Sequence, residues 1–228
     1  MRPTCLVAAI LMFVANVLCA AEAESPSAAA GLSEKESQEG FVSLFDGKTL
    51  NGWQGATGGY VAENGLLVCK KHGGGKLLTT KEYGDFILRF DFKLQPGGNN
   101  GVALRTPKDG NPAYMGMESQ IIDNAFYADG KPFKLRPYQC HASIYGCVPA
   151  KTGHMKPAGQ WNSQEISCNG SQVKITLNGV VIVDTDLAKI EEPMDGRPHP
   201  GLKRAKGFLG FLGHGSRVEF RNIRIKEL

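Results

Sequence analysis

The chain has 228 residues, a formal net charge of +4, 42% hydrophobic residues and 21% charged residues. This composition is typical of a globular protein and excludes a disordered chain. The positive excess is small and dispersed, so the sequence predicts no nucleic-acid partner. Glycine is frequent, at 29 residues, which is well above the ~7% of average proteins and predicts many turns.

Residues 1–23 have the layout of a secretory signal segment. A positive residue at position 2 precedes an apolar run from Cys5 to Leu18, and small residues follow at Ala20, Ala21 and Ala23. The run is shorter than the ~20 residues that span a bilayer. We therefore expect a secreted or periplasmic protein without a membrane anchor, with a retained N-terminal anchor as the alternative. Residues 24–39 are small and polar and predict a disordered spacer, and residues 40–228 predict one domain.

Four cysteines remain after the signal segment, at positions 69, 140, 147 and 168. In an oxidising compartment, four cysteines allow three pairings. A Cys140–Cys147 bridge is favoured because it closes a short loop. The chain has no Cys-x-x-Cys pair there, so a structural zinc site is not predicted.

The body of the chain shows a period of two. Apolar residues alternate with polar ones over residues 86–92 and 173–177, and the second run leads through Asn178-Gly179 into the apolar run 180–183. This pattern predicts half-buried strands and one tight hairpin. The apolar parity changes between residues 218–220 and 223–225, which predicts a β-bulge near Arg221-Asn222.

Turn signals such as Asp46-Gly47 and Asn64-Gly65 separate these runs, and no segment of ten or more residues keeps a helical period. Residues 188–192 predict one turn of helix at most. Many short strands without alternating helices favour an all-β sandwich or jelly roll of antiparallel sheets. The sequence has no internal repeat, so a propeller is not predicted.

A conventional two-carboxylate glycosidase is disfavoured. Such enzymes need two carboxylates on opposite sides of the scissile bond. Glu118 and Asp123 are the nearest candidates, but they are five positions apart and point to opposite faces of a regular strand.

A polar face is predicted instead. Glu118 and Gln120 share one side of their strand, and Arg105 shares the parity of Ala103 on the strand before. We expect the Arg105 guanidinium and the Glu118 carboxylate to line one hollow, with a structural ion pair between them as the alternative. Charged residues are unusual in a packed core and are expected on a sugar-binding face.

Several other residues are candidates for the site. His214 lies between two glycines and is the first candidate for an acid, a base or a metal ligand. His141 is a second candidate, and Tyr145 has the same parity and a hydroxyl that can donate to an enolate. Trp161 has a ring that can stack on a sugar, although Trp53 and Trp161 also suit core packing. Three histidines in loops, at positions 72, 154 and 199, are interpreted as surface residues.

Several stretches in order are distinctive: LFDGKTLNGW (44–53), YGDFILRFDF (83–92), NNGVALR (99–105), MESQIID (117–123), SIYG (143–146), Trp161-Asn162, LNGV (177–180) and residues 213–223. Their order and spacing resemble the 3-keto-disaccharide hydrolase domain family. The resemblance covers residues 40–228. It implies a concanavalin A-like jelly roll, an exported bacterial protein and a carbohydrate substrate of the 3-keto-glycoside class.

The resemblance also implies a site. Arg105, Glu118 and His214 carry the chemistry with His141 and Tyr145, and Gln120, Asn100 and Trp161 bind the sugar. The family usually has Leu-Gln-Asp-His-Gly near its end, where this chain has Phe-Leu-Gly-His-Gly at 211–215. The chain therefore lacks the carboxylate before His214. A divalent metal ion held by Glu118 and His214 is an open alternative.

The chemistry of a 3-keto sugar needs one base, one acid and a group that stabilises an enolate oxygen. The ketone acidifies the proton at C2, so removal of that proton and loss of the C1 oxygen, followed by hydration, give net hydrolysis. Two other classes stay open. A non-catalytic carbohydrate-binding module is favoured by the missing carboxylate, and an interaction domain would be indicated by an apolar patch on the polar face.

Overall fold

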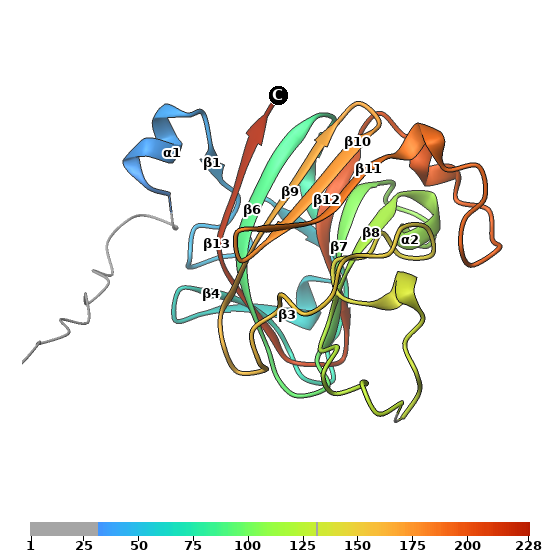
Figure 1. Ribbon diagram of the computed structural model, residues 1–228. Helices are drawn as coiled ribbons and strands as arrows, with labels where there is room; N and C mark the ends of the chain where they lie inside the picture. Colours follow the sequence, from blue (N-terminus) through green and yellow to red (C-terminus); the bar gives the residue numbers. More distant parts are fainter. Residues whose placement is uncertain (1–31, 131) are drawn as a thin grey trace, which may run out of the picture.

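The alternating segments form antiparallel strands in a computed structural model, which describes residues 32–130 and 132–228 (Figure 1). In the strand Phe86–Leu94, the side chains of residues 86, 88, 90, 92 and 94 are buried, and the intervening ones are half-buried. The strands are β1 (Val42–Ser43), β2 (Trp53–Gly55), β3 (Tyr60–Glu63), β4 (Leu66–Cys69), β5 (Gly74–Tyr83), β6 (Phe86–Leu94), β7 (Asn99–Thr106), β8 (Met117–Ile122), β9 (Asn162–Asn169), β10 (Gln172–Leu177), β11 (Val180–Asp186), β12 (Gly207–His214) and β13 (Val218–Glu227).

These strands make two sheets that pack face to face. One has the order β11-β10-β9-β6-β13-β4-β3 with β1 on β13, and the other has the order β2-β5-β12-β7-β8. Short helices lie in the connections: α1 (Glu34–Gln38), α2 (Pro112–Met115) and the 3₁₀ turns η2 (Thr57–Gly59), η3 (Pro137–Gln139), η4 (Leu187–Lys189) and η5 (Pro200–Lys203). The predicted all-β jelly-roll sandwich is confirmed.

The inner faces of both sheets carry the core. The Phe211 ring on β12 stacks on the Phe220 ring on β13 at 3.9 Å between centroids, and Trp53 stacks on Phe211 at 5.7 Å. The Trp53 indole also donates to the Leu44 carbonyl. Trp53 is therefore a core residue, as one interpretation of the sequence held.

The predicted hairpin and bulge are both present. Asn178 and Gly179 join β10 to β11 with positive φ values of 49° and 85°, which a type I′ turn requires. The pairing of β13 with β6 shifts between Arg221 and Arg224, where Asn222 has φ 52°. This bulge explains the change of parity in the sequence.

The end of the predicted spacer is ordered. The predicted signal segment 1–23 and residues 24–31 of the spacer lie outside the described residues, but α1 spans Glu34–Gln38. The Ser33 side chain caps this helix, and Glu36 reaches both Arg89 at 3.1 Å and Arg224 at 2.7 Å. Disorder is therefore the wrong prediction for this stretch, because these ion pairs fasten the helix to β6 and β13.

The predicted disulfide is also absent. Cys69, Cys140, Cys147 and Cys168 are free thiols in the described part of the chain. Cys147 is buried in the core, whereas the half-buried Cys140 thiol lies 3.7 Å from the Arg136 carbonyl. The favoured Cys140–Cys147 pairing fails because the two side chains occupy different surroundings. Within residues 32–130 and 132–228, no helix has the length and apolarity needed to cross a membrane.

Candidate functional site

Strand β8 places Glu118 on the outer face of the five-stranded sheet. Met117 and Ile121 face the core, so Glu118 and Gln120 face outward, as strand alternation requires. Opposite β8 lies β7, where Ala103 pairs with Glu118 and Gly101 pairs with Gln120. A Cβ atom at residue 101 would collide with Glu118 Oε1. The carboxylate therefore lies over the bare backbone of Gly101.

Burial changes the acidity of Glu118. The residue is 7% exposed, and Oε1 has no hydrogen-bond partner within the described residues. Desolvation raises the pKa of this carboxyl to about 7, because burial penalises the charged form. A carboxyl with such a pKa can take up or release a proton near neutral pH, which is the property a general base needs.

Glu118, Gln120, Tyr145 and His214 line one cavity of about 240 Å³. Four predicted site residues therefore meet in space. The Tyr145 backbone N–H donates to the Glu118 carbonyl at 2.9 Å, and the Gln139 amide donates to the Tyr145 hydroxyl at 3.2 Å. The remaining lining residues are Asn99, Asn111, Ala113, Tyr114, Ile122, Phe133, Leu135 and Gln139.

Two residues that line the cavity carry buried oxygen atoms without a hydrogen-bond partner among the described residues. Besides Glu118 Oε1, the buried Oδ1 of Asn99 has no partner among the described residues. Gln120 Oε1 accepts from the Ile121 backbone N–H at 3.0 Å, which leaves the amide NH₂ of Gln120 as its donor group. Buried polar atoms in native proteins are normally paired.

His214 lies at the end of β12 and is solvent-exposed at the cavity. Desolvation of the ring by its surroundings lowers the pKa of the imidazole from its ordinary value, which favours the neutral form. The neighbouring Gly213 faces inward, and a Cβ there would lie 2.5 Å from the Cys69 thiol and 3.0 Å from the Tyr60 hydroxyl. In this chain, the space beneath residue 213 is filled, and position 213 does not face the cavity.

Arg105 does not share this cavity, so the expectation of a common hollow for Arg105 and Glu118 is wrong. The pairing of β7 with β12 shifts between Phe208 and Gly210, and Arg105 has φ 48°. This bulge turns the side chain away from the outer face. The alternative of an Arg105–Glu118 ion pair fails for the same reason.

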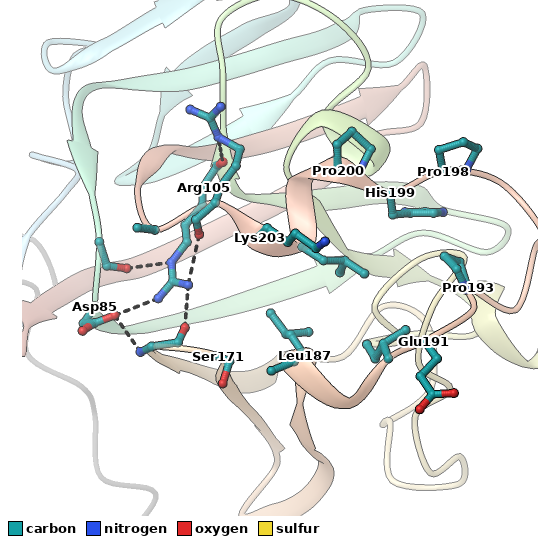
Figure 2. A pocket seen from close by; sticks show the side chains of 17 residues that line it. Asp85, Arg105, Ser171, Leu187, Glu191, Pro193, Pro198, His199, Pro200 and Lys203 are labelled. Carbon is teal, nitrogen blue, oxygen red and sulfur yellow. Dashed lines mark hydrogen bonds and ion pairs between the residues drawn. The ribbon is translucent and has the colours of Figure 1, made fainter.

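The guanidinium is instead held at the opposite end of β7 (Figure 2). It donates to the Gly84 carbonyl at 2.9 Å and the Gly170 carbonyl at 2.7 Å, and it pairs with Asp85 at 2.8 Å. Arg105 is 2% exposed and borders a separate cavity of about 840 Å³. All three partners lie in turns, between β5 and β6 or between β9 and β10. Arg105 therefore joins two turns of the sandwich.

His141 and Asn100 lie inside the sandwich. The His141 ring is 2% exposed, stacks on Phe92 at 4.9 Å and lies 3.0 Å from Gln164 Oε1. Burial lowers its pKa to about 4, so the ring is neutral. Asn100 is fully buried, and its Oδ1 accepts from the Leu212 N–H at 3.1 Å. Neither residue borders the cavity of Glu118, which corrects their expected contact with substrate.

Trp161 also lies away from the cavity. Its ring packs against Lys93 at 4.9 Å and Arg221 at 4.4 Å, residues of β6 and β13 in the other sheet. The ring thus makes cation–π contacts at the other sheet and does not border the cavity of Glu118, where it was expected to stack on a sugar.

The sequence did not reveal the second wall of the cavity. Tyr114 stands in α2, which begins with an Asn111 cap and Pro112, a recognisable start signal for a helix. His199 was interpreted as a surface residue but is 7% exposed and packs against Tyr114 at 4.7 Å. Its ring nitrogens lie 3.1 Å from Asp195 Oδ1 and 3.1 Å from the Ala113 carbonyl.

The described residues contain no group of three or more His, Cys, Asp or Glu side chains arranged to hold a metal ion. Glu118 and His214 border the same cavity without a third such ligand.

The apolar side chains on the outer face of the five-stranded sheet are few and buried: Leu78 and Leu212 are 3% and 6% exposed. They do not form the exposed patch that would indicate an interaction domain.

Fold and cavity together define a jelly-roll protein with a small acidic pocket on the outer face of one sheet. The chain belongs to the 3-keto-alpha-glucoside-1,2-lyase-like domain family, whose profile matches residues 40–226. This confirms the family indicated by the ordered motifs.

A curated relative and several solved structures agree with this placement. The chain is 30% identical to a 3-keto-disaccharide hydrolase of Bacteroides thetaiotaomicron, over 83% of this chain and 79% of the relative. It is 29% identical to a candidate glycosyl hydrolase of Parabacteroides distasonis with a TM-score of 0.73, covering 86% and 98% of the two chains. A carbohydrate-binding module of Bacillus subtilis, at 14% identity and a TM-score of 0.53 over 77% and 96%, shares the fold alone.

Proposed function

We propose that this protein cleaves 3-keto-glycosides in the cavity of Glu118. The observation that carries the proposal is a single buried carboxyl whose pKa is raised to about 7, in a cavity without a second carboxylate. Such a site suits removal of one acidified C–H proton, and it lacks the paired carboxylates of ordinary glycosidases. The names of the family and of the 30% identical relative support this substrate class.

The mechanism follows from the groups in the cavity. Ionised Glu118 takes the C2 proton, and the C2–H electron pair forms an enolate with the C3 ketone. The enolate collapses to a C1=C2 double bond and expels the C1 oxygen, which takes a proton from Tyr145 or water. Addition of water then delivers hydroxide to C1 and a proton to C2. The balance is one 3-keto-glycoside and one water giving a 3-keto sugar and an alcohol.

The enolate oxygen needs a donor, because its charge grows as the C2 proton leaves. Arg105 lies outside the cavity, so the polar side chains that line it supply the donors, among them the Gln120 amide, the Tyr145 hydroxyl and the His214 ring. Neutral donors suit a cavity whose base must stay basic, since a guanidinium beside Glu118 would lower the pKa of its carboxyl.

Substitution of Glu118 tests the proposal. Glu118→Gln keeps the shape and removes the base, so we expect cleavage of a 3-keto-disaccharide to fall by about 10²–10⁴-fold. The matched control is Glu165→Gln, which removes a carboxylate paired with Arg89 on the other sheet and should leave the rate within about twofold. Product is measured by chromatography after mixing with purified protein. Unchanged cleavage by Glu118→Gln would contradict the assignment.

A non-catalytic sugar-binding protein is the second candidate, favoured by one observation. His214 has no neighbouring carboxylate from position 213, where glycine stands and the space is filled by Cys69 and Tyr60. Binding of intact 3-keto-disaccharide by the wild-type protein, without release of product, would select this candidate.

A further inference from the structure

The cavity of Glu118 is small for a disaccharide. Its volume is about 240 Å³, below the roughly 300–1,000 Å³ of ordinary small-molecule pockets. If the 3-keto ring occupies it, as the proposed function requires, the rest of the glycoside extends past the rim. What lies at the rim therefore determines which glycosides are accepted.

An aromatic cluster stands at this rim. Phe133 borders the cavity and is 48% exposed. Its ring lies 4.9 Å from the Tyr127 ring, which in turn lies 5.1 Å from the Phe126 ring. Tyr127 is 9% exposed, so it forms a buried support behind Phe133. The Phe133 ring is thus held in place with much of its surface open to water.

This exposure is unusual for the molecule. The exposed large hydrophobic residues of the described chain include two aromatic ones, Phe126 and Phe133, and both belong to the cluster. Of the two, Phe133 borders the cavity and Phe126 does not, and exposed apolar surface at the mouth of a polar cavity is typical of a contact surface for a ligand. An aromatic face suits the apolar C–H surface of a pyranose ring, because burial of both is favourable and neither needs a hydrogen bond.

We propose that Phe133 is a specificity-determining residue, whose ring stacks on the second, leaving-group ring of the glycoside. This inference rests on the proposed function for the location of the 3-keto ring. It predicts a preference for glycosides whose leaving group is itself a ring, such as a sugar or an aryl alcohol, over those with a small alkyl leaving group. Tyr127 is a positioning residue that supports Phe133 from behind.

Two matched variants test the role of Phe133. Phe133→Ala removes the platform, and we expect KM for a 3-keto-disaccharide to rise about tenfold with kcat within about twofold, the effect of losing one buried ring contact. Phe126→Ala removes a ring of the same type and a similar exposure of 47%, which does not border the cavity. It should leave KM unchanged. Phe133→Tyr should restore wild-type KM, because it restores the ring.

A one-ring ligand separates this role from general damage to the cavity. The inhibition constant of the free 3-keto monosaccharide should be the same for Phe133→Ala and wild type, since that ligand lies inside. Three results would overturn the inference. Phe133→Ala and Phe126→Ala could raise KM for the disaccharide equally, or Phe133→Ala could leave that KM unchanged. Phe133→Ala could also weaken inhibition by the monosaccharide as much as it weakens use of the disaccharide.

Separate measurements, of cleavage and of binding, test the proposed catalysis and the role of Phe133. If the wild-type protein cleaves no 3-keto-disaccharide, the proposed catalysis is contradicted. Phe133 is then tested by calorimetric binding of the same disaccharide. A roughly tenfold weaker binding by Phe133→Ala than by Phe126→Ala still supports the platform. Equal binding by the two variants, or no binding by the wild type, overturns it.

Discussion

At the scale of single residues, environment decides chemistry more than residue type does. Glu118 and His141 are both buried and titratable, yet only Glu118 borders the cavity. Burial raises the pKa of Glu118 to about 7 and lowers that of His141 to about 4. Both shifts favour the neutral form. The raised pKa suits Glu118 as a base that ionises near neutral pH. The lowered pKa of His141 keeps its ring neutral within the core.

The raised pKa of Glu118 predicts the pH dependence of cleavage. The base is the ionised carboxylate, which forms as pH rises above the pKa, so kcat/KM should rise about tenfold per pH unit below about 7 and level off above it. An ordinary carboxyl would level off near its usual 4.5. A pH–rate profile of the wild-type protein measures this, with Glu165→Gln expected to follow the same curve. A plateau that already begins near pH 5 would contradict the role of Glu118.

At the scale of elements, the strand pattern could be predicted from the sequence and the bulges only in part. Alternation correctly placed Glu118 and Gln120 on one face of β8, and it located the bulge at Asn222 because apolar parity changes there. The bulge at Arg105 gave no such signal, since the residues around it are apolar or small on both parities. The position of Arg105 was therefore mispredicted.

Close packing between β7 and β8 also shapes the site. Gly101→Ala would push a methyl group into the Glu118 carboxylate and displace it, and a displacement of about 1 Å can cost about 10²-fold in rate. We expect kcat/KM to fall by this order. The control is Gly58→Ala, where a Cβ meets nothing within 4 Å, and its rate should equal that of the wild type. A Gly101→Ala protein of wild-type activity would show that the position of the carboxylate is unimportant.

At the scale of the whole molecule, the features that the sequence could not predict depend on contacts between residues distant in sequence. His141 pairs with Gln164 on β9 and stacks on Phe92 on β6, and α1 is fastened by Glu36 to Arg89 and Arg224. These partners are distant in sequence and become neighbours only in the folded molecule. Local patterns predicted the sandwich and half of the site, but they could not show which polar residues turn inward.

Arg105 illustrates such a structural role, and its substitution gives a further prediction. Arg105→Met leaves the carbonyls of Gly84 and Gly170 without their donor, so the free energy of unfolding should fall by roughly 2–4 kcal/mol. In protein that remains folded, kcat should change less than about twofold, since Arg105 lies outside the cavity of Glu118. Lys81→Met, which breaks an exposed pair with Glu227, should leave the urea midpoint almost unchanged, because exposed ion pairs contribute little to stability. Urea unfolding and steady-state kinetics measure both.

The result that would contradict this separation of roles is an Arg105→Met protein of wild-type stability and greatly reduced kcat. That outcome would indicate that the Arg105 guanidinium takes part in the reaction.

Removal of the C2 proton by Glu118 is the central claim, and the direct measurement is the rate of C1–O cleavage in a single turnover of a 3-keto-disaccharide carrying deuterium at C2. We expect slower cleavage of the deuterated compound than of the ordinary one, and loss of most cleavage of both in Glu118→Gln. Equal rates for the two compounds, with full cleavage by Glu118→Gln, would show that neither the C2–H bond nor this carboxyl takes part.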